Sequence, residues 1–219
     1  DFPLNGLTLI TGVSGSGKTS LIKQVLYPAI SNYLGIFGKK LGSFDKISVD
    51  TESLKKIEFI DQNPIGKSSR SNPVTYIKAF DDIRNLFASQ PLAKSRNYKS
   101  GFFSFNIDGG RCEHCHGDGE ITVEMQFMAD VHLLCEDCKG ERYKDEILEI
   151  KFHDKNIADI LKLTIEEAID FFTEQKADRI ALKLSPLLQV GLGYVTLGQS
   201  SNTLSGGEAQ RIKLASFLG

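Results

Sequence analysis

The sequence predicts an α/β fold into which an α+β domain is inserted, and two observations carry this prediction. Two glycine-rich motifs stand near opposite ends of the 219 residues, each just before an expected helix. Between them stand two Cys-x-x-Cys pairs, a pattern typical of a four-thiolate metal module. The expected metal module therefore interrupts a fold whose two ends carry phosphate-binding motifs.

A buried strand followed by a helix is expected near the start of the chain. Residues 7–11 are a short, apolar and partly β-branched run that ends at a glycine. Residues 19–26 carry apolar side chains on one helical face, and Pro28 is expected to follow the end of that helix. A second strand is expected at residues 57–60, closed by Pro64, because proline has no N–H for a strand ladder.

The loop between the first strand and the helix matches the phosphate-binding pattern Gly-x4-Gly-Lys-Thr. Its glycines let backbone N–H groups converge on the β- and γ-phosphates, and the helix N-terminus adds partial positive charge. We expect Lys18 to reach the terminal phosphates of ATP and the Thr19 hydroxyl to bind Mg²⁺. A flexible Gly/Ser turn is the alternative, but it does not account for the complete match. The expected nucleotide-binding residues of this loop are Gly12, Ser14, Gly15, Ser16, Gly17, Lys18 and Thr19.

The second glycine-rich motif is Ser205-Gly206-Gly207-Glu208, which precedes a helix. A Ser-x-x-Glu capping box explains the serine and the glutamate but leaves both glycines unexplained, since each costs helix stability. By the same helix N-terminus argument as for the first motif, we expect this motif to bind phosphate, and the candidate residues are Ser205, Gly206, Gly207 and Glu208. Gln62 is a weak signal alone, but between a P-loop and this motif it occupies the place of a Q-loop near the γ-phosphate. This order predicts a P-loop NTPase of the ABC-ATPase type, in which the second motif completes the site of a facing nucleotide domain.

Cys112, Cys115, Cys135 and Cys138 are the expected metal ligands. Four thiolates complete a tetrahedron around Zn²⁺ and leave no position for water, so the expected role is structural rather than catalytic. Two disulfides, a redox-active pair or buried free thiols are the alternatives. Because the cysteines already complete the ligand set, the histidines nearby are expected at the surface or hydrogen-bonded around the centre.

The remaining elements are read from apolar spacing and helix signals. Residues 74–87 predict a partly buried helix, residues 95–110 a loop, and residues 147–152 a strand. Thr164 and Glu167 form a capping box that begins another helix. We expect an ATP-binding subdomain at 1–65, a signature and insertion domain at 66–200 with its zinc module at about 108–145, and a signature helix at 201–219.

Charge is distributed unevenly along the chain. The formal net charge is −2, yet residues 66–111 carry eight basic against three acidic residues, and residues 112–150 carry three basic against eleven acidic ones. Clustered Lys and Arg are needed to neutralise DNA phosphates, so the first stretch is the candidate DNA surface. The candidate contacts, each weak alone, are Arg70, Lys78, Arg84, Lys94, Arg96, Lys99 and Arg111. No apolar run approaches the ~20 residues of a membrane span, so we expect no membrane partner.

Six motifs taken together are far more specific than the P-loop alone. They lie at residues 12–19, 62–66, 70–73, 103–106, 109–112 and 204–211. In this combination the chain resembles the UvrA family, which belongs to the bacterial excinuclease ABC, over almost its whole length. It looks like the N-terminal part of that family's second nucleotide-binding half.

The resemblance implies an ATP-dependent protein that dimerises, recognises damaged double-stranded DNA in the bacterial cytoplasm and loads UvrB for nucleotide-excision repair. It implies ATP, Mg²⁺ and Zn²⁺ as cofactors. Carried over residue by residue, it assigns Lys18, Thr19 and Gln62 to the chain's own nucleotide site, Ser205 and Gly207 to the facing site, and the four cysteines to zinc. A sensor of diverse lesions should rely on phosphate contacts and duplex deformability rather than base readout.

The sequence departs from the family pattern in one respect, and three alternatives stay open. No strand ending in Asp-Glu and no later histidine follows the second motif, so we expect a fragment without efficient hydrolysis by itself. A transporter ATPase would have about half the distance between the two motifs and no zinc. A UvrA-like paralogue acting on DNA-bound drugs and a DnaJ-like zinc interaction module are the other two possibilities.

Overall fold

The computed structural model describes residues 2–4, 6–38, 40–48, 54–66, 68, 70–125, 127 and 130–218. These residues form two compact units, Asp1–Phe59 and Ile60–Gly219. Within the described part of the chain, no helix combines the length and the apolar character needed to cross a bilayer. The division at residues 65 and 200 that the sequence suggests stays a prediction.

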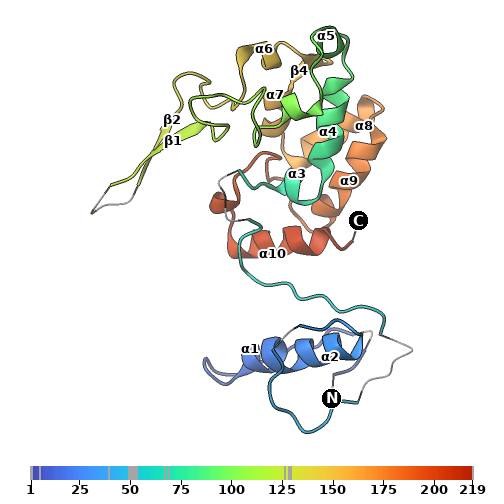
Figure 1. The fold of residues 1–219 in the computed structure, drawn as a ribbon. Coiled ribbons are helices and arrows are strands. Elements are labelled where there is room, and N and C mark those ends of the chain that lie inside the picture. The colour runs from blue at the N-terminus through green and yellow to red at the C-terminus, as the bar shows by residue number, and fades with distance from the viewer. Residues whose placement is uncertain are drawn as a thin grey trace. The chain divides into compact units, whose positions relative to one another are not determined.

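The first unit is built on one continuous helical stretch that follows the glycine-rich loop. It consists of α1 (Lys18–Ser20), a π-helical segment (Leu21–Leu26) and α2 (Tyr27–Tyr33) (Figure 1). The helix therefore runs past Pro28, where the sequence predicted its end. Proline cannot donate to the carbonyl four residues earlier, and the Gly42 N–H donates to that Gln24 carbonyl instead, at 2.8 Å.

The two strands predicted in this part of the chain are not formed among the described residues. Residues 7–11 and 57–60 have no ladder partner, and Leu7 is 99% exposed. A strand is held by hydrogen bonds to a neighbouring strand and by burial of its apolar face. Among the described residues both runs lack the hydrogen bonds, and residues 7–11 are also mostly exposed. Residues 7–11 are apolar, but they do not form a buried strand in this structure, so that prediction was wrong.

The second unit is mainly helical, and its helices enclose one hydrophobic core (Figure 1). Its largest fully buried side chains are aromatic or branched aliphatic and include Phe87, Phe103, Phe105 and Phe172. The helices and 3₁₀ turns are α3 (Pro73–Tyr76), α4 (Ala79–Ala88), α5 (Pro91–Ser95), η2 (Ser100–Phe103), α6 (Asp145–Leu148), α7 (Ile157–Lys162), α8 (Ile165–Glu174), α9 (Asp178–Gln189), η3 (Ser201–Thr203) and α10 (Gly206–Ala215).

Two short antiparallel hairpins accompany these helices. β1 (Glu120–Val123) pairs with β2 (Val131–Leu134), with Glu120 opposite Leu134 and Val123 opposite Val131. β3 (Lys151–Phe152) pairs with β4 (Lys155–Asn156). Figure 1 shows β1 and β2 reaching away from the helices of their unit. The first hairpin connects the two cysteine pairs, so it belongs to the metal module.

Two of the predicted elements differ from the structure in detail. The helix expected at 74–87 is divided into α3 and α4, because Lys78 adopts a left-handed conformation with φ of 60°. The strand expected at 147–152 was largely wrong, since α6 occupies Asp145–Leu148 and only Lys151–Phe152 pair. Asp145 and Glu146 lie in the first turn of α6 and stabilise its N-terminus electrostatically. The prediction from the alternating apolar pattern did not take these two acidic residues into account.

Both predicted capping boxes are confirmed, and they fix where α8 and α10 begin. The Thr164 hydroxyl accepts from the Glu167 N–H, and the Glu167 carboxylate accepts from the Thr164 N–H. Ser205 and Glu208 form the same reciprocal pair. Each box satisfies two backbone donors that a helix N-terminus leaves free. The start of α10 places the second glycine-rich motif on an ordered helix end.

A candidate metal centre and two glycine-rich motifs

The four cysteine side chains converge on one buried point. Their sulfur atoms all lie within 4.8 Å of one another, and each residue is at most 5% exposed. The Sγ–Sγ distance is 3.9 Å between Cys112 and Cys135 and 3.6 Å between Cys115 and Cys138. A tetrahedron with metal–sulfur bonds of about 2.3 Å has edges of about 3.8 Å. The cysteines therefore have the spacing of a four-thiolate site.

The same distances decide between metal binding and disulfides. A disulfide holds its sulfurs about 2.05 Å apart, and all four cysteines are free thiols here. Burial raises the pKa of the Cys115 thiol, and burial with the neighbouring Cys115 and Cys135 thiols raises the pKa of Cys138 to about 12. A bound divalent cation would lower these pKa values again, because it stabilises the thiolates. The donor set thus fits a soft divalent metal such as zinc.

The two cysteine pairs share one backbone conformation. In each, the residue after the second cysteine and the glycine that follows have positive φ: 51° and 88° at His116 and Gly117, 50° and 85° at Lys139 and Gly140. A Cβ on Gly117 would lie 2.0 Å from the Phe105 carbonyl oxygen. Glycine is required there because the loop packs directly on another backbone segment.

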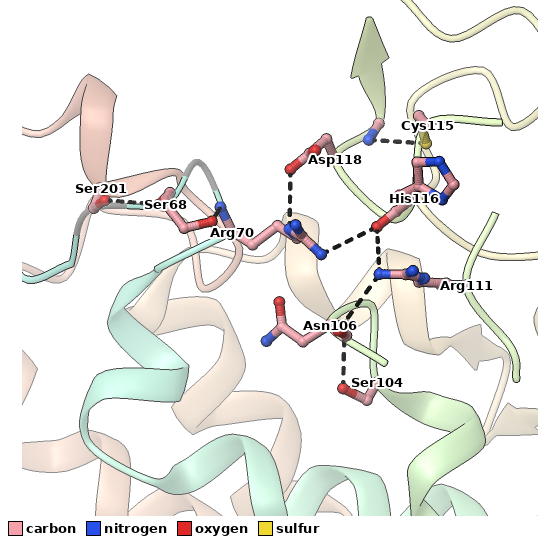
Figure 2. Close-up of polar contacts among 10 residues, drawn as sticks. Ser68, Arg70, Ser104, Asn106, Arg111, Cys115, His116, Asp118 and Ser201 are labelled. Atoms are coloured by element: carbon pink, nitrogen blue, oxygen red, sulfur yellow. Dashed lines mark hydrogen bonds and ion pairs between the residues drawn. The ribbon is translucent and has the colours of Figure 1, made fainter. Parts of the chain in front are cut away.

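The histidines stand outside the cysteine cluster, as predicted. His114 Nδ1 lies 2.9 Å from Asp137 Oδ2, so one residue from each pair meets at the surface. His132 Nδ1 lies 3.2 Å from the Thr122 hydroxyl across the β1–β2 hairpin. His116 contributes its backbone carbonyl to the network of Figure 2.

Two of the predicted DNA-binding arginines hold the metal module to the rest of its unit (Figure 2). Arg70 Nη1 and Arg111 Nη1 both donate to the His116 carbonyl, at 3.4 and 3.2 Å. Arg70 Nε also lies 3.4 Å from Asp118 Oδ1, and Arg111 Nη2 lies 2.7 Å from Asp108 Oδ1. Both guanidinium groups therefore have structural partners beside the first cysteine pair.

The other basic candidates fall into two groups. Arg84 pairs with Asp81, and Arg96 pairs with Glu149. The three lysines of the set are exposed and have no ion pair among the described residues; they are Lys78, Lys94 and Lys99. These lysines could contact a DNA phosphate without breaking an ion pair, whereas each arginine would have to give up an existing partner.

The first glycine-rich motif forms a loop in which the lysine folds back over the backbone. Lys18 Nζ donates to the carbonyls of Gly12 and Val13 at 2.8 and 2.6 Å. Gly12, Gly15 and Gly17 have positive φ, and α1 begins at Lys18. Thr19 lies exposed in the first turn of α1. The loop thus holds an ammonium group and a helix N-terminus at the same place.

The second motif lies at the start of α10, and Tyr194 contacts it from outside the motif. Tyr194 donates to Glu208 Oε1 at 2.6 Å, and the Ser205 N–H donates to Glu208 Oε2 at 2.7 Å. These hydrogen bonds hold the pKa of Glu208 below its usual value. Arg211 Nη2 donates to the Tyr194 hydroxyl at 3.4 Å. Sequence reasoning missed Tyr194, and only its place in a Gly-x-Gly-Tyr turn could have drawn attention to it.

Gln62 lies beside the same helix end. A Cβ on Gly206 would be 3.7 Å from the Gln62 Cβ, so the two backbones are in near contact. The preceding Asp61 pairs with Lys213 of α10, which holds the pKa of Asp61 below its usual value. The structure therefore brings Gln62, Gly206 and the Ser205 cap together within one unit.

Comparison with known proteins gives matches over the whole chain. The chain is 54% identical over 218 residues to UvrABC system protein A of Staphylococcus epidermidis, and 54% identical to that of Staphylococcus aureus. Over its full length, this chain matches part of UvrABC system protein A. Each match covers 100% of the chain and 23% of the relative, so the chain spans about a quarter of the length of these proteins.

The structural comparison agrees with the sequence comparison. The crystal structure of UvrA2 from Deinococcus radiodurans matches 94% of this chain and 24% of the UvrA2 chain, with a TM-score of 0.81 and 48% identity. No protein-family model matches the chain. The similarity to UvrABC system protein A predicted from the six motifs is therefore confirmed.

Proposed function

We propose that this chain is the nucleotide-, zinc- and DNA-binding part of a UvrA-type protein that recognises damaged duplex DNA in nucleotide-excision repair. The observation that carries the proposal is 54% identity over the whole chain to UvrABC system protein A. The names of these relatives place them in the UvrABC system. In the intact protein we propose an ABC-type ATPase that acts as a homodimer with UvrB as its partner.

In this proposal the four cysteines bind one structural Zn²⁺. Zinc supplies charge neutralisation for four buried thiolates and has no open position for substrate. The chain's own residues do the rest: the glycines form the turns, and Arg70 and Arg111 fasten the module to its unit. The centre therefore orients the β1–β2 hairpin instead of taking part in chemistry.

The glycine-rich motifs would bind ATP and Mg²⁺. Lys18, which holds the Gly12 and Val13 carbonyls here, would exchange them for phosphate oxygens, and Thr19 would supply a hydroxyl ligand to the metal ion. In the intact protein, Gln62 would contribute to the chain's own nucleotide site, and Ser205 with Gly206 and Gly207 would bind the phosphates held by a facing nucleotide domain. Gly12, Ser14, Gly15, Ser16 and Gly17 would form the cradle, with Glu208 holding the cap of α10.

The DNA surface would lie along the basic stretch, and the three exposed lysines are its first candidates. Removing one phosphate contact lowers the slope of log K against log salt by about 1 for duplex DNA. Charge reversal at all three should therefore weaken affinity equally for different sequences and flatten the salt dependence. Matched reversals at two exposed lysines outside the stretch, Lys151→Glu and Lys176→Glu, serve as the control.

The test of the whole proposal uses the intact protein and two duplexes that differ by one lesion. The expected result is tighter binding of the damaged duplex, with discrimination that depends on ATP and is lost in Lys18→Ala. Equal affinity for both duplexes at every nucleotide and salt condition would overturn the proposal. Zinc content measured in the same samples separates loss of function from loss of the metal module.

A further inference from the structure

Tyr194 is fixed in place although its ring is largely exposed. Its neighbours Leu192 and Val195 are buried in the core, at 0% and 1% exposure. The Gly193 carbonyl accepts from the Glu166 N–H at 3.1 Å, and the Val195 carbonyl accepts from the Ile165 N–H at 2.9 Å. The turn that carries Tyr194 is thus tied on both sides to the start of α8.

From this fixed turn the Tyr194 hydroxyl reaches the second glycine-rich motif. It donates to Glu208 Oε1 at 2.6 Å, while 61% of the residue is exposed. Arg211, one turn further along α10, donates to the same hydroxyl at 3.4 Å. Because the turn is held by the core, the hydroxyl defines where one oxygen of the Glu208 carboxylate lies.

The other carboxylate oxygen of Glu208 holds Ser205 by two bonds. Glu208 Oε2 accepts from the Ser205 N–H at 2.7 Å and from the Ser205 hydroxyl at 2.9 Å. The Glu208 N–H donates back to the Ser205 Oγ at 3.3 Å. Without its hydrogen bond to Tyr194 the carboxylate would be held through Oε2 alone, and the orientation of the Ser205 hydroxyl would then be less narrowly defined.

We propose that Tyr194 is a positioning residue for the phosphate-binding serine of the second motif, acting through the Glu208 carboxylate. This inference rests on the proposed function, because it concerns the serine that would face a nucleotide. Tyr194 touches no nucleotide in this scheme. It keeps Ser205 in a single orientation, from which the hydroxyl turns from Glu208 Oε2 to a phosphate oxygen when the facing domain closes.

The test compares Tyr194→Phe with the unaltered intact protein. The change removes one oxygen atom and leaves the ring, so the fold should be kept. We expect kcat for ATP hydrolysis to fall about three- to tenfold, the range for loss of one ordinary, partly solvated hydrogen bond, while nucleotide affinity at the first motif changes less than twofold. Tyr98→Phe, whose ring stacks on Phe102, is the matched control and should behave as the unaltered protein.

A double-mutant cycle separates positioning from a general loss of stability. Glu208→Gln should lower kcat as well, and adding Tyr194→Phe to it should cost little more, because both changes break the same chain of hydrogen bonds. In the isolated chain, the carboxyl resonance of Glu208 should report a higher pKa in Tyr194→Phe than in the unaltered chain.

Three outcomes would overturn the inference. The first is an unchanged kcat in Tyr194→Phe, and the second is strictly additive effects in the cycle. The third is a fall in kcat that follows the fall in melting temperature in Tyr194→Phe, Glu208→Gln and the double variant alike. Lys18→Ala distinguishes this failure from failure of the proposed function. If Lys18→Ala abolishes ATP binding while Tyr194→Phe has the kinetics of the unaltered protein, only the role of Tyr194 is lost.

Discussion

Replacement of Gly117 by alanine tests how tightly the first cysteine pair is packed. An alanine Cβ at this position would lie 2.0 Å from the Phe105 carbonyl oxygen and 2.9 Å from the carbonyl carbon. Ordinary contacts begin near 3.4 Å, so the backbone would have to move by more than 1 Å. Phe105 is itself fully buried, which leaves the segment little room to yield.

Gly140→Ala is the matched control because Gly140 holds the equivalent place after the second cysteine pair. Its φ of 85° is close to the 88° of Gly117, so both alanines suffer the same left-handed strain of about 1–2 kcal/mol. At Gly140, however, the new Cβ meets only the end of the Leu134 side chain, at 3.0 Å. We therefore expect Gly140→Ala to cost about 1–2 kcal/mol and Gly117→Ala about 1–3 kcal/mol more, since forced overpacking adds to the strain.

The assay is urea unfolding of the zinc-loaded chain, followed by circular dichroism, together with zinc affinity from competition with a chelator. Gly117→Ala should lose more stability and more zinc affinity than Gly140→Ala. Equal losses in the two variants would show that backbone conformation alone sets the cost, and the close packing of residue 117 on residue 105 would then be refuted.

The remaining predictions concern the contacts around the two motifs and the metal module. Arg70→Ala should speed hydrogen exchange at residues 116–119, because one of the two donors to the His116 carbonyl and the ion pair with Asp118 are removed, whereas Arg96→Ala should leave that segment unchanged; the reverse pattern would contradict this role of Arg70. The pKa of Glu208 is lowered, first by Tyr194 and then by the Ser205 N–H, so its contribution to stability is present above its unfolded pKa of about 4.5 and is lost as the pH falls through the lower folded value. Thermal melts from pH 6 to pH 3 should therefore show a smaller acid loss in Glu208→Gln, and identical curves would argue against the cap. Metal affinity should also fall on acidification, since protons compete for buried thiolates, and a zinc titration at two pH values checks this.

The sequence predicted best those features that depend on local chemistry. The capping boxes at Thr164 and Ser205 are confirmed, because a short side chain and a glutamate three residues later satisfy each other's backbone donors without help from elsewhere. The cysteine cluster was equally predictable, since the spacing within each Cys-x-x-Cys pair places both sulfurs on one turn.

Features that depend on distant partners were predicted less well. The apolar run at residues 7–11 has no strand beside it among the described residues, and apolar pattern alone cannot supply one. Residues 147–152 alternate as a strand would, yet burial of Ile147 and Ile150 against the helical core is achieved with α6 over part of that run. The partners of the arginines could not be predicted from the sequence either. Arg70 and Arg111 were predicted to be DNA contacts, but the fold places both beside the His116 carbonyl.

Native mass spectrometry of the purified chain tests the account most directly, because every role proposed for the metal module requires one closed four-thiolate centre. The account predicts a single species with one zinc ion per chain, and loss of that species in Cys135→Ser but not in His114→Ala. A metal-free folded chain, or a zinc ion retained in Cys135→Ser and lost in His114→Ala, would contradict it.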